Sequence, residues 1–145
     1  MTLQNLLGIS LDAIAPDKAQ IARLLAAAQR NIADAQLKGL SAENRFDAAY
    51  KAIMQLAMTA LHANGYRTLT SKPGHHQTAI QTLPLTVVLP PAKVIVLVAL
   101  RKQRNLADYG GELVSDAAAA ECLASAKALQ AHVLAWLRAE RPALL

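Results

Sequence analysis

The sequence has few of the residues on which several common classes of protein depend. It contains one cysteine in 145 residues, so an internal disulfide is excluded, and the single Cys122 suits a reducing compartment. Aromatic residues make up 3% of the chain, whereas 54% is hydrophobic. Much of that apolar content is alanine, which favours helices and lets them approach closely. The composition therefore predicts a helical protein, and the length suits one domain with a sizeable core.

The sequence also lacks the segments that direct a chain into or across a membrane. The N-terminus MTLQNLLGIS has no basic region and no small-residue cleavage site, so no secretory signal is expected. The longest apolar stretch, residues 83–100, is interrupted by three prolines and Lys93. A bilayer span needs about 20 apolar residues. We therefore expect a cytoplasmic protein with no membrane partner.

Acidic residues are absent from the middle of the chain. No aspartate or glutamate lies between Asp47 and Asp108, and the net charge is +5. A long region of one charge sign suggests an anionic partner such as nucleic acid or nucleotide. The alternative is that acids from the terminal helices fold back beside it, and the sequence leaves both open. The basic residues and histidines of this region are Lys51, His62, Arg67, Lys72, His75, His76, Lys93, Arg101, Lys102 and Arg104.

Apolar periodicity predicts a bundle of four or five helices. The predicted helical segments are residues 16–38, a second helix that begins after Ser41 and that Asn64-Gly65 ends, and residues 75–83, 92–109 and 115–138. Gly39 is expected to end the first in a left-handed conformation, and Ser41 to cap the second. Residues 66–74 are expected to form a loop. Short connections make neighbouring helices antiparallel, so we expect an all-α, up-and-down bundle forming one domain over residues 1–145, with residues 1–15 as an N-terminal extension.

The segment from residue 92 to residue 109 carries two conflicting patterns. Its first part, KVIVLVAL, is rich in β-branched residues and is typical of a buried strand. Its second part, ALRKQRNLADY, favours a helix. A lone strand would have no partner, because no second strand pattern appears in the chain, so we interpret the whole segment as helix. Pro90 and Pro91 would begin it and Gly110-Gly111 would end it.

As a helix, this segment has a face that is apolar in its first turns and polar in its last. The face comprises residues 94, 97, 98, 101, 104, 105 and 108. Arg104 and Asn105 are therefore expected to line a cleft or an interface, with Tyr109 one turn further on. A guanidinium binds phosphate at two points, and an amide can orient a ribose hydroxyl. The spacing alone equally permits a structural pair between Arg104 and Asp108, four residues apart.

Three stretches resemble the HEPN (higher eukaryotes and prokaryotes nucleotide-binding) superfamily. The stretch RFDAAYKAIMQLAMTALHANGYR is similar to the family's second helix with its Gly-Tyr exit. SKPGHHQTAIQTLP is similar to the loop and short helix that follow. LRKQRNLADYGG resembles the helix that carries the family motif, which is Arg, a polar residue, three variable residues and His. Arg104 and Asn105 match the first two positions, and Tyr109 stands in place of the His.

The resemblance implies a helical, homodimeric protein that binds RNA or nucleotide. It implies that Arg104, Asn105 and Tyr109 are the catalytic positions of a metal-independent endoribonuclease, the toxin of a toxin–antitoxin pair. Arg101 and Lys102 would join Arg104 in binding phosphate. No metal or cofactor is expected, and the implied antitoxin is a nucleotidyltransferase-type protein. Because a phenol with a pKa near ~10 is a poor base, the alternative is a non-catalytic binding or structural dimerisation module.

Other polar or reactive residues carry weaker signals. His75 and His76 are adjacent, so their side chains would diverge on a helix, and no cluster of Cys and His accompanies them. We interpret them as solvated, with assistance in anion binding as the alternative. Cys122 lies on an apolar stripe and is not expected to be a nucleophile. Core packing is the expected role of Tyr50, with stacking on a base as the alternative.

Overall fold

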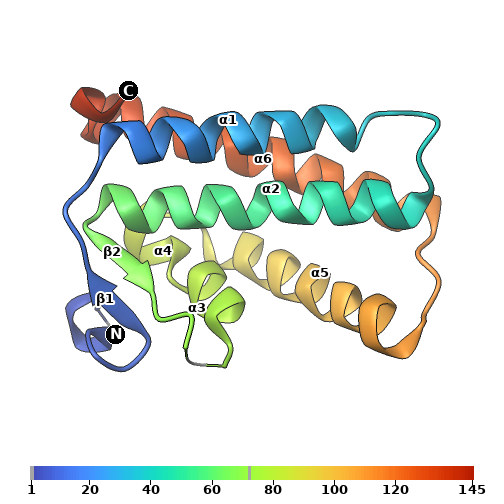
Figure 1. Ribbon diagram of the computed structural model, residues 1–145, viewed down its shortest axis with the longest axis horizontal. Helices are drawn as coiled ribbons and strands as arrows, with labels where there is room; N and C mark the ends of the chain where they lie inside the picture. The colour runs from blue at the N-terminus through green and yellow to red at the C-terminus, as the bar shows by residue number, and fades with distance from the viewer. Residues whose placement is uncertain (1, 72) are drawn as a thin grey trace.

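The computed structural model describes residues 2–71 and 73–145, so Lys72 of the basic region lies outside the described residues. The protein is mainly helical, as the composition predicts (Figure 1). The helices are α1 (Lys18–Asp34), α2 (Ala42–Ala63), α3 (His75–Gln81), α4 (Leu83–Thr86), α5 (Pro91–Gly110) and α6 (Asp116–Glu140). Two short strands, β1 (Leu11–Ala13) and β2 (Tyr66–Thr68), and two 3-10 turns, η1 (Gln4–Leu6) and η2 (Pro142–Leu144), complete the described chain.

Helix α2 is the centre of the bundle. Helices α1 and α6 pack along it, and the four long helices α1, α2, α5 and α6 alternate in direction (Figure 1). Phe46, Ile53 and Leu56 of α2 are fully or almost fully buried. Ala49 and Ala57 have no exposed surface, so the small side chains allow neighbouring helices to lie close. Helix α5 lies along a different side of α2 and contacts α3 and α4. Side chains on the buried face of α5 therefore contact α2 and α3.

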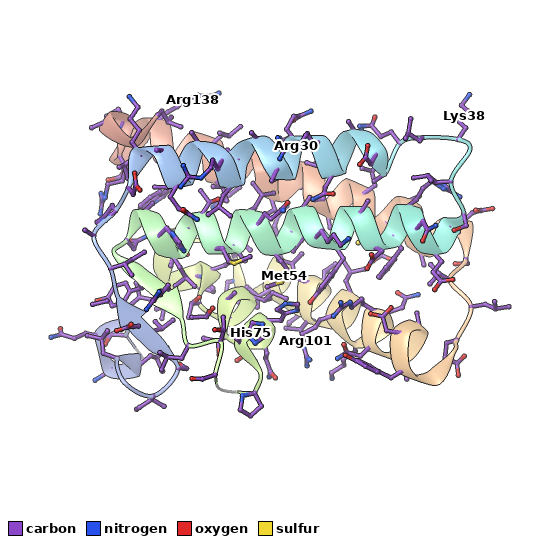
Figure 2. The ribbon with its side chains drawn as sticks, viewed as in Figure 1. Arg30, Lys38, Met54, His75, Arg101 and Arg138 are labelled. Atoms are coloured by element: carbon purple, nitrogen blue, oxygen red, sulfur yellow. The ribbon has the colours of Figure 1, made fainter. Side chains whose placement is uncertain are left out.

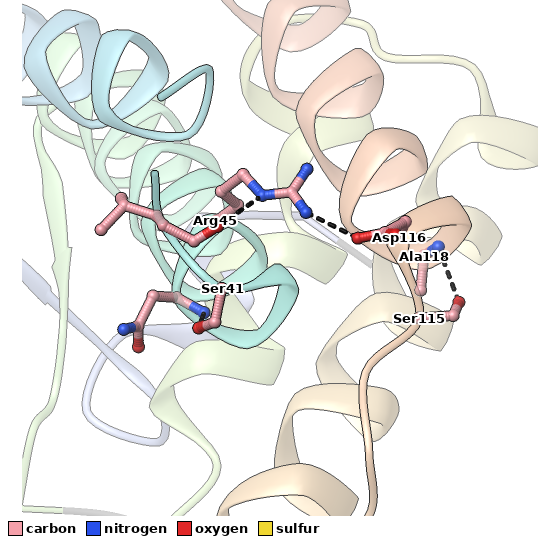
Figure 3. A network of polar contacts seen from close by, with 7 residues as sticks. Ser41, Arg45, Ser115, Asp116 and Ala118 are labelled. Carbon is pink, nitrogen blue, oxygen red and sulfur yellow. Dashed lines mark hydrogen bonds and ion pairs between the residues drawn. The ribbon is translucent and has the colours of Figure 1, made fainter. Parts of the chain in front are cut away.

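The helix starts follow the capping residues in the sequence. The Oγ of Ser41 accepts a hydrogen bond from the Asn44 amide at 3.1 Å, and the Oγ of Ser115 accepts one from the Ala118 amide at 3.0 Å (Figure 3). Arg45 of α2 then pairs with Asp116 of α6 at 2.7 Å, which joins the first turns of these two helices. The predicted cap of the second helix is confirmed.

Two sequence predictions about helix ends and loops are wrong. The first helix ends at Asp34, four residues before Lys38, and Gly39 does not adopt the positive φ expected of a left-handed stop. The expected loop over 66–74 begins with β2, which pairs antiparallel with β1. The pairing buries Leu11 completely and fastens the N-terminal segment to the end of α2.

The ambiguous segment 92–109 is helical throughout, as α5. Pro91 occupies the first turn, where a missing N–H costs nothing. Gly111 ends the helix in the left-handed region at φ 71°, and its N–H donates to the Leu106 carbonyl. Between α4 and α5 the chain turns through Val88, which has a positive φ of 58°. His132 of α6 hydrogen-bonds the preceding carbonyl of Val87 at 2.7 Å, which fixes this turn and the start of α5.

Candidate functional site

Helix α5 presents its polar residues on two separate faces. One face continues the buried stripe of Leu97 and Leu100 and carries Arg101 and Arg104 toward α2 and α3. The other face carries the exposed residues Lys102, Leu106 and Tyr109, together with the half-buried Asn105, at helical spacing. Arg101 and Arg104 therefore have different surroundings from Lys102 and Tyr109, although all four lie on the last turns of the same helix.

Arg104 is held between two groups of the protein itself. Its Nε lies 2.9 Å from Oδ2 of Asp108, which is ion-pair distance. The Nε–H is nevertheless not directed at an acceptor, so the contact is electrostatic and not an aligned hydrogen bond. The guanidinium carbon also lies 5.4 Å from the centre of the Tyr50 ring, a cation–π arrangement. The structural pair that the spacing permits is thus present.

The space on the Asp108 side of Arg104 is small and acidic. A cavity of about 90 Å³ there is lined by Arg104, Asp108, Glu43 and Asp47, among others. The acids at the start of α2 therefore fold back beside this arginine. A phosphate group at this place would meet three carboxylates, so this side of Arg104 does not favour an anion.

Arg101, one turn earlier, has different surroundings. Its side chain is half-buried, and its Nε has no hydrogen-bond partner among the described residues. It forms no ion pair within residues 2–71 and 73–145. A half-buried cation without a counter-charge is electrostatically costly, and a bound anion would compensate it. Figure 2 shows Arg101 on α5 on the same side of the molecule as His75 of α3.

The two histidines of α3 are half-buried and contact neighbouring side chains, so they are not fully solvated. The rings of His75 and His76 meet edge to face at 4.6 Å between centroids. Nδ1 of His76 lies 3.4 Å from the hydroxyl of Tyr50, a long hydrogen bond from α3 to α2. Helix α3 also packs against α5. Tyr50 thus contacts both His76 and Arg104, and Arg101 lies near enough for its charge to act on Tyr50 and His76. We call these four residues with His75 the Tyr50 cluster.

Ionisation in the Tyr50 cluster reflects burial and the two guanidiniums. Burial raises the pKa of Tyr50 to about 12, although the charges of Arg104 and Arg101 act in the opposite sense. The phenol is therefore neutral and serves as a hydrogen-bond donor or acceptor. Burial, and then the neighbouring His75, Arg104 and Arg101, lower the pKa of His76. His76 is accordingly a neutral imidazole at pH 7.

The structure does not bring the three expected catalytic residues together. Arg104 faces Tyr50, whereas Asn105 and Tyr109 line the exposed face with Lys102. The Tyr109 side chain is 84% exposed. Five residues separate Arg104 from Tyr109, a rotation of roughly 140° around a helix. Within one chain, Arg104 therefore lies on a different face of α5 from Tyr109, and the catalytic role expected of Arg104, Asn105 and Tyr109 stays a prediction.

A second concavity lies between α5 and α6 and has a different character. It has a volume of about 460 Å³ and is mostly apolar, with Lys93 as its charged lining residue. Lys93 and Arg101 are eight residues apart on α5, or roughly 12 Å along the helix. This groove is therefore separate from the Tyr50 cluster.

Other possible sites find no support in the geometry. Within residues 2–71 and 73–145, no group of three or more His, Cys, Asp or Glu side chains is placed to hold a metal ion. In the same described part of the chain, no helix is long and apolar enough to span a bilayer. Cys122 is fully buried, and burial raises its pKa to about 12, so its thiol is a poor nucleophile.

Comparison with known proteins supplies no relative: the chain matches no protein-family model, no curated protein and no solved structure. The candidate site therefore depends on its own geometry. Sequence reasoning selected Arg101 and Arg104 but set aside His75 and His76, which belong to the same cluster. The signal that could have identified them is their position inside the acid-free region that also contains both arginines.

Proposed function

We propose that this protein binds the phosphate groups of RNA or nucleotides at the Tyr50 cluster, with Arg101 as the principal phosphate ligand. The supporting observation is the half-buried Arg101, which has no ion-pair partner among the described residues and whose charge acts on the neighbouring His76. Lys102 on the adjacent exposed face adds electrostatic attraction along the same helix. Arg104 contributes mainly by holding Tyr50 in place.

The proposal agrees with the nucleotide-binding half of the HEPN resemblance. It moves the expected phosphate contact from Arg104 to Arg101, because Arg104 already pairs with Asp108 and borders an acidic cavity. Homodimerisation and neutralisation by an antitoxin of the nucleotidyltransferase type are further parts of the proposal that the resemblance implies.

The test is the salt dependence of RNA binding, measured by fluorescence anisotropy with a short single-stranded RNA. Each phosphate contact with a single strand adds about 0.7 to the slope of log affinity against log salt. Arg101→Ala is expected to weaken binding and to reduce this slope by about that amount. The matched control is Arg30→Ala, because Arg30 is an exposed arginine on α1, far from Arg101 in Figure 2. Equal slopes for the native chain and Arg101→Ala would contradict the proposal.

Cleavage of RNA is a separate question, because the motif position expected to hold a histidine holds the exposed Tyr109. Within one chain, an imidazole at this position would lie away from both guanidiniums of the Tyr50 cluster. We therefore expect Tyr109→His to leave cleavage of labelled RNA in EDTA at the native level. A gain of cleavage in this variant would show that a second copy of the chain brings the two faces together.

A further inference from the structure

His76 and Tyr50 form a pair whose proton arrangement can change without breaking their contact. With neutral His76, the Tyr50 hydroxyl donates to Nδ1, and the imidazole proton lies on Nε2. With protonated His76, the Nδ1–H donates to the Tyr50 oxygen, which then accepts. Because Tyr50 keeps its own proton in both states, it orients the His76 ring toward the same position throughout.

The titratable and charged groups around His76 come from three helices. His75 lies beside it on α3, Tyr50 faces it from α2, and Arg101 and Arg104 act on it from α5. Asp108 offsets Arg104, whereas Arg101 has no carboxylate partner in the part of the chain that the structure describes. Protonation of His76 would therefore give this point a net charge of about two positive units. An internal phosphodiester carries one negative charge, but a phosphate monoester carries about −1.5 to −2 at pH 7.

Resting on the proposed function, we propose that His76 and Arg101, with His75 beside them, form a site for a terminal phosphate monoester, and that His76 takes up one proton from solvent when the phosphate binds. The ligand is a nucleoside monophosphate or a phosphorylated RNA end. Nε2 of His76 and the guanidinium of Arg101 donate to the phosphate oxygens. Both side chains are half-buried, which suits the end of a chain better than a phosphate with nucleotides on both sides.

Proton uptake follows from the present state of His76. The pKa of the free imidazole is lowered by burial, then by the neighbouring cations, so it is neutral near pH 7. A bound dianion favours the charged imidazolium and raises that pKa again. Binding is expected to be strongest near pH 6. The proton is then readily available, while about half of the monoester, with a second pKa near ~6, is still dianionic.

The test compares one short RNA with a 5′-phosphate or a 5′-hydroxyl, using calorimetry at pH 6.5 in two buffers of different ionisation enthalpy. The native protein should prefer the phosphorylated RNA by roughly tenfold or more, the size expected for a hydrogen bond to a charged group. It should also take up close to one proton. The His76→Gln variant should lose both the preference for phosphorylated RNA and the proton uptake. His62→Gln should keep both, because His62 lies 12 residues from Tyr50 along α2, or roughly 18 Å.

A second readout uses only the native chain, so it does not require that a substituted protein folds. In the native chain, the NMR titration of His76 should shift to higher pH when phosphorylated RNA is added. Equal binding of the two RNAs, or binding without proton uptake, would overturn this inference while leaving the proposed function intact. Failure of both RNAs to bind would overturn both. Inorganic phosphate that binds as tightly as the phosphorylated RNA would support the phosphate site and assign it to free phosphate.

Discussion

At the scale of single residues, Arg101 and Arg104 show how one turn of helix changes the role of the same side chain. Arg104 faces an ion-pair partner and an aromatic ring, so its charge is compensated within the protein. Arg101 has a buried Nε without a partner among the described residues. A half-buried cation that the fold does not compensate gives the protein no net stabilisation and is free to contribute to binding. The two arginines therefore predict opposite mutational effects.

Arg104→Ala is expected to lower the free energy of unfolding by about 1–2 kcal/mol, because it removes a cation–π contact and an ion pair and leaves Asp108 near two other acids. Arg101→Ala is expected to change the same free energy by less than about 0.5 kcal/mol. Urea denaturation of both variants measures the difference. Arg104→Lys keeps the charge without the planar stacking and should lie between the native chain and Arg104→Ala. A larger loss for Arg101→Ala than for Arg104→Ala would contradict these assignments.

At the scale of elements, the long helices could be predicted from the sequence and the short strands could not. Helix α5 contains the strand-like run KVIVLVAL, yet it was predicted as a helix because no second strand pattern appeared in the chain, and the structure confirms the helix. Strands β1 and β2 have three residues each, too few for a period of two to be recognised. The Tyr50 cluster was only partly predictable for a related reason. Its residues are near one another only after α2, α3 and α5 pack, and His76 lies 26 positions from Tyr50 in the chain.

The turn that leads into α5 contains Val88 in a strained backbone conformation, and this strain predicts how a substitution there changes the free energy of unfolding. Val88 adopts φ 58° and is 72% exposed, so its β-branched side chain carries strain with little burial in return. Val88→Gly is expected to raise the free energy of unfolding by about 0.5–1 kcal/mol, the net of relieved strain and the greater entropy of glycine in the unfolded chain. Thermal denaturation measures this change. The matched control Ala124→Gly, at an exposed position inside α6, should instead lose about 1 kcal/mol. A destabilised Val88→Gly would show that the valine side chain makes a contribution that outweighs its strain.

At the scale of the whole molecule, two histidines link stability to pH. Burial lowers the pKa of His76 and of His62, and nearby cations lower both further. The unfolded chain, in which histidine titrates near ~6.5, therefore binds protons at pH values where the folded chain does not. The free energy of unfolding should consequently fall as the pH drops through that value. Melting temperatures at pH 7.5 and 5.5 measure the effect, and the double variant His62→Gln with His76→Gln should reduce it. An unchanged pH dependence in the double variant would assign the effect to other groups.

An exposed stripe on α5 gives a prediction about the association of two copies. Ile95, Leu106 and Tyr109 are 70%, 58% and 84% exposed, and Leu113 just beyond the helix is 96% exposed. On α5, Lys102, Leu106 and Tyr109 follow one another in steps of four and three, and Ile95 lies seven positions before Lys102, which is the spacing of a helix seam that packs against another helix. Contiguous exposed apolar residues of this kind mark interaction surfaces. We therefore expect a homodimer that joins along α5.

Light scattering coupled to size-exclusion chromatography measures this association directly. The native chain should elute with the mass of a dimer, and Leu106→Glu should shift it to the monomer because a carboxylate would be buried in the seam. Leu37→Glu is the matched control, since Leu37 is 52% exposed but lies in the turn between α1 and α2. A monomeric native chain at tens of micromolar would exclude the dimer.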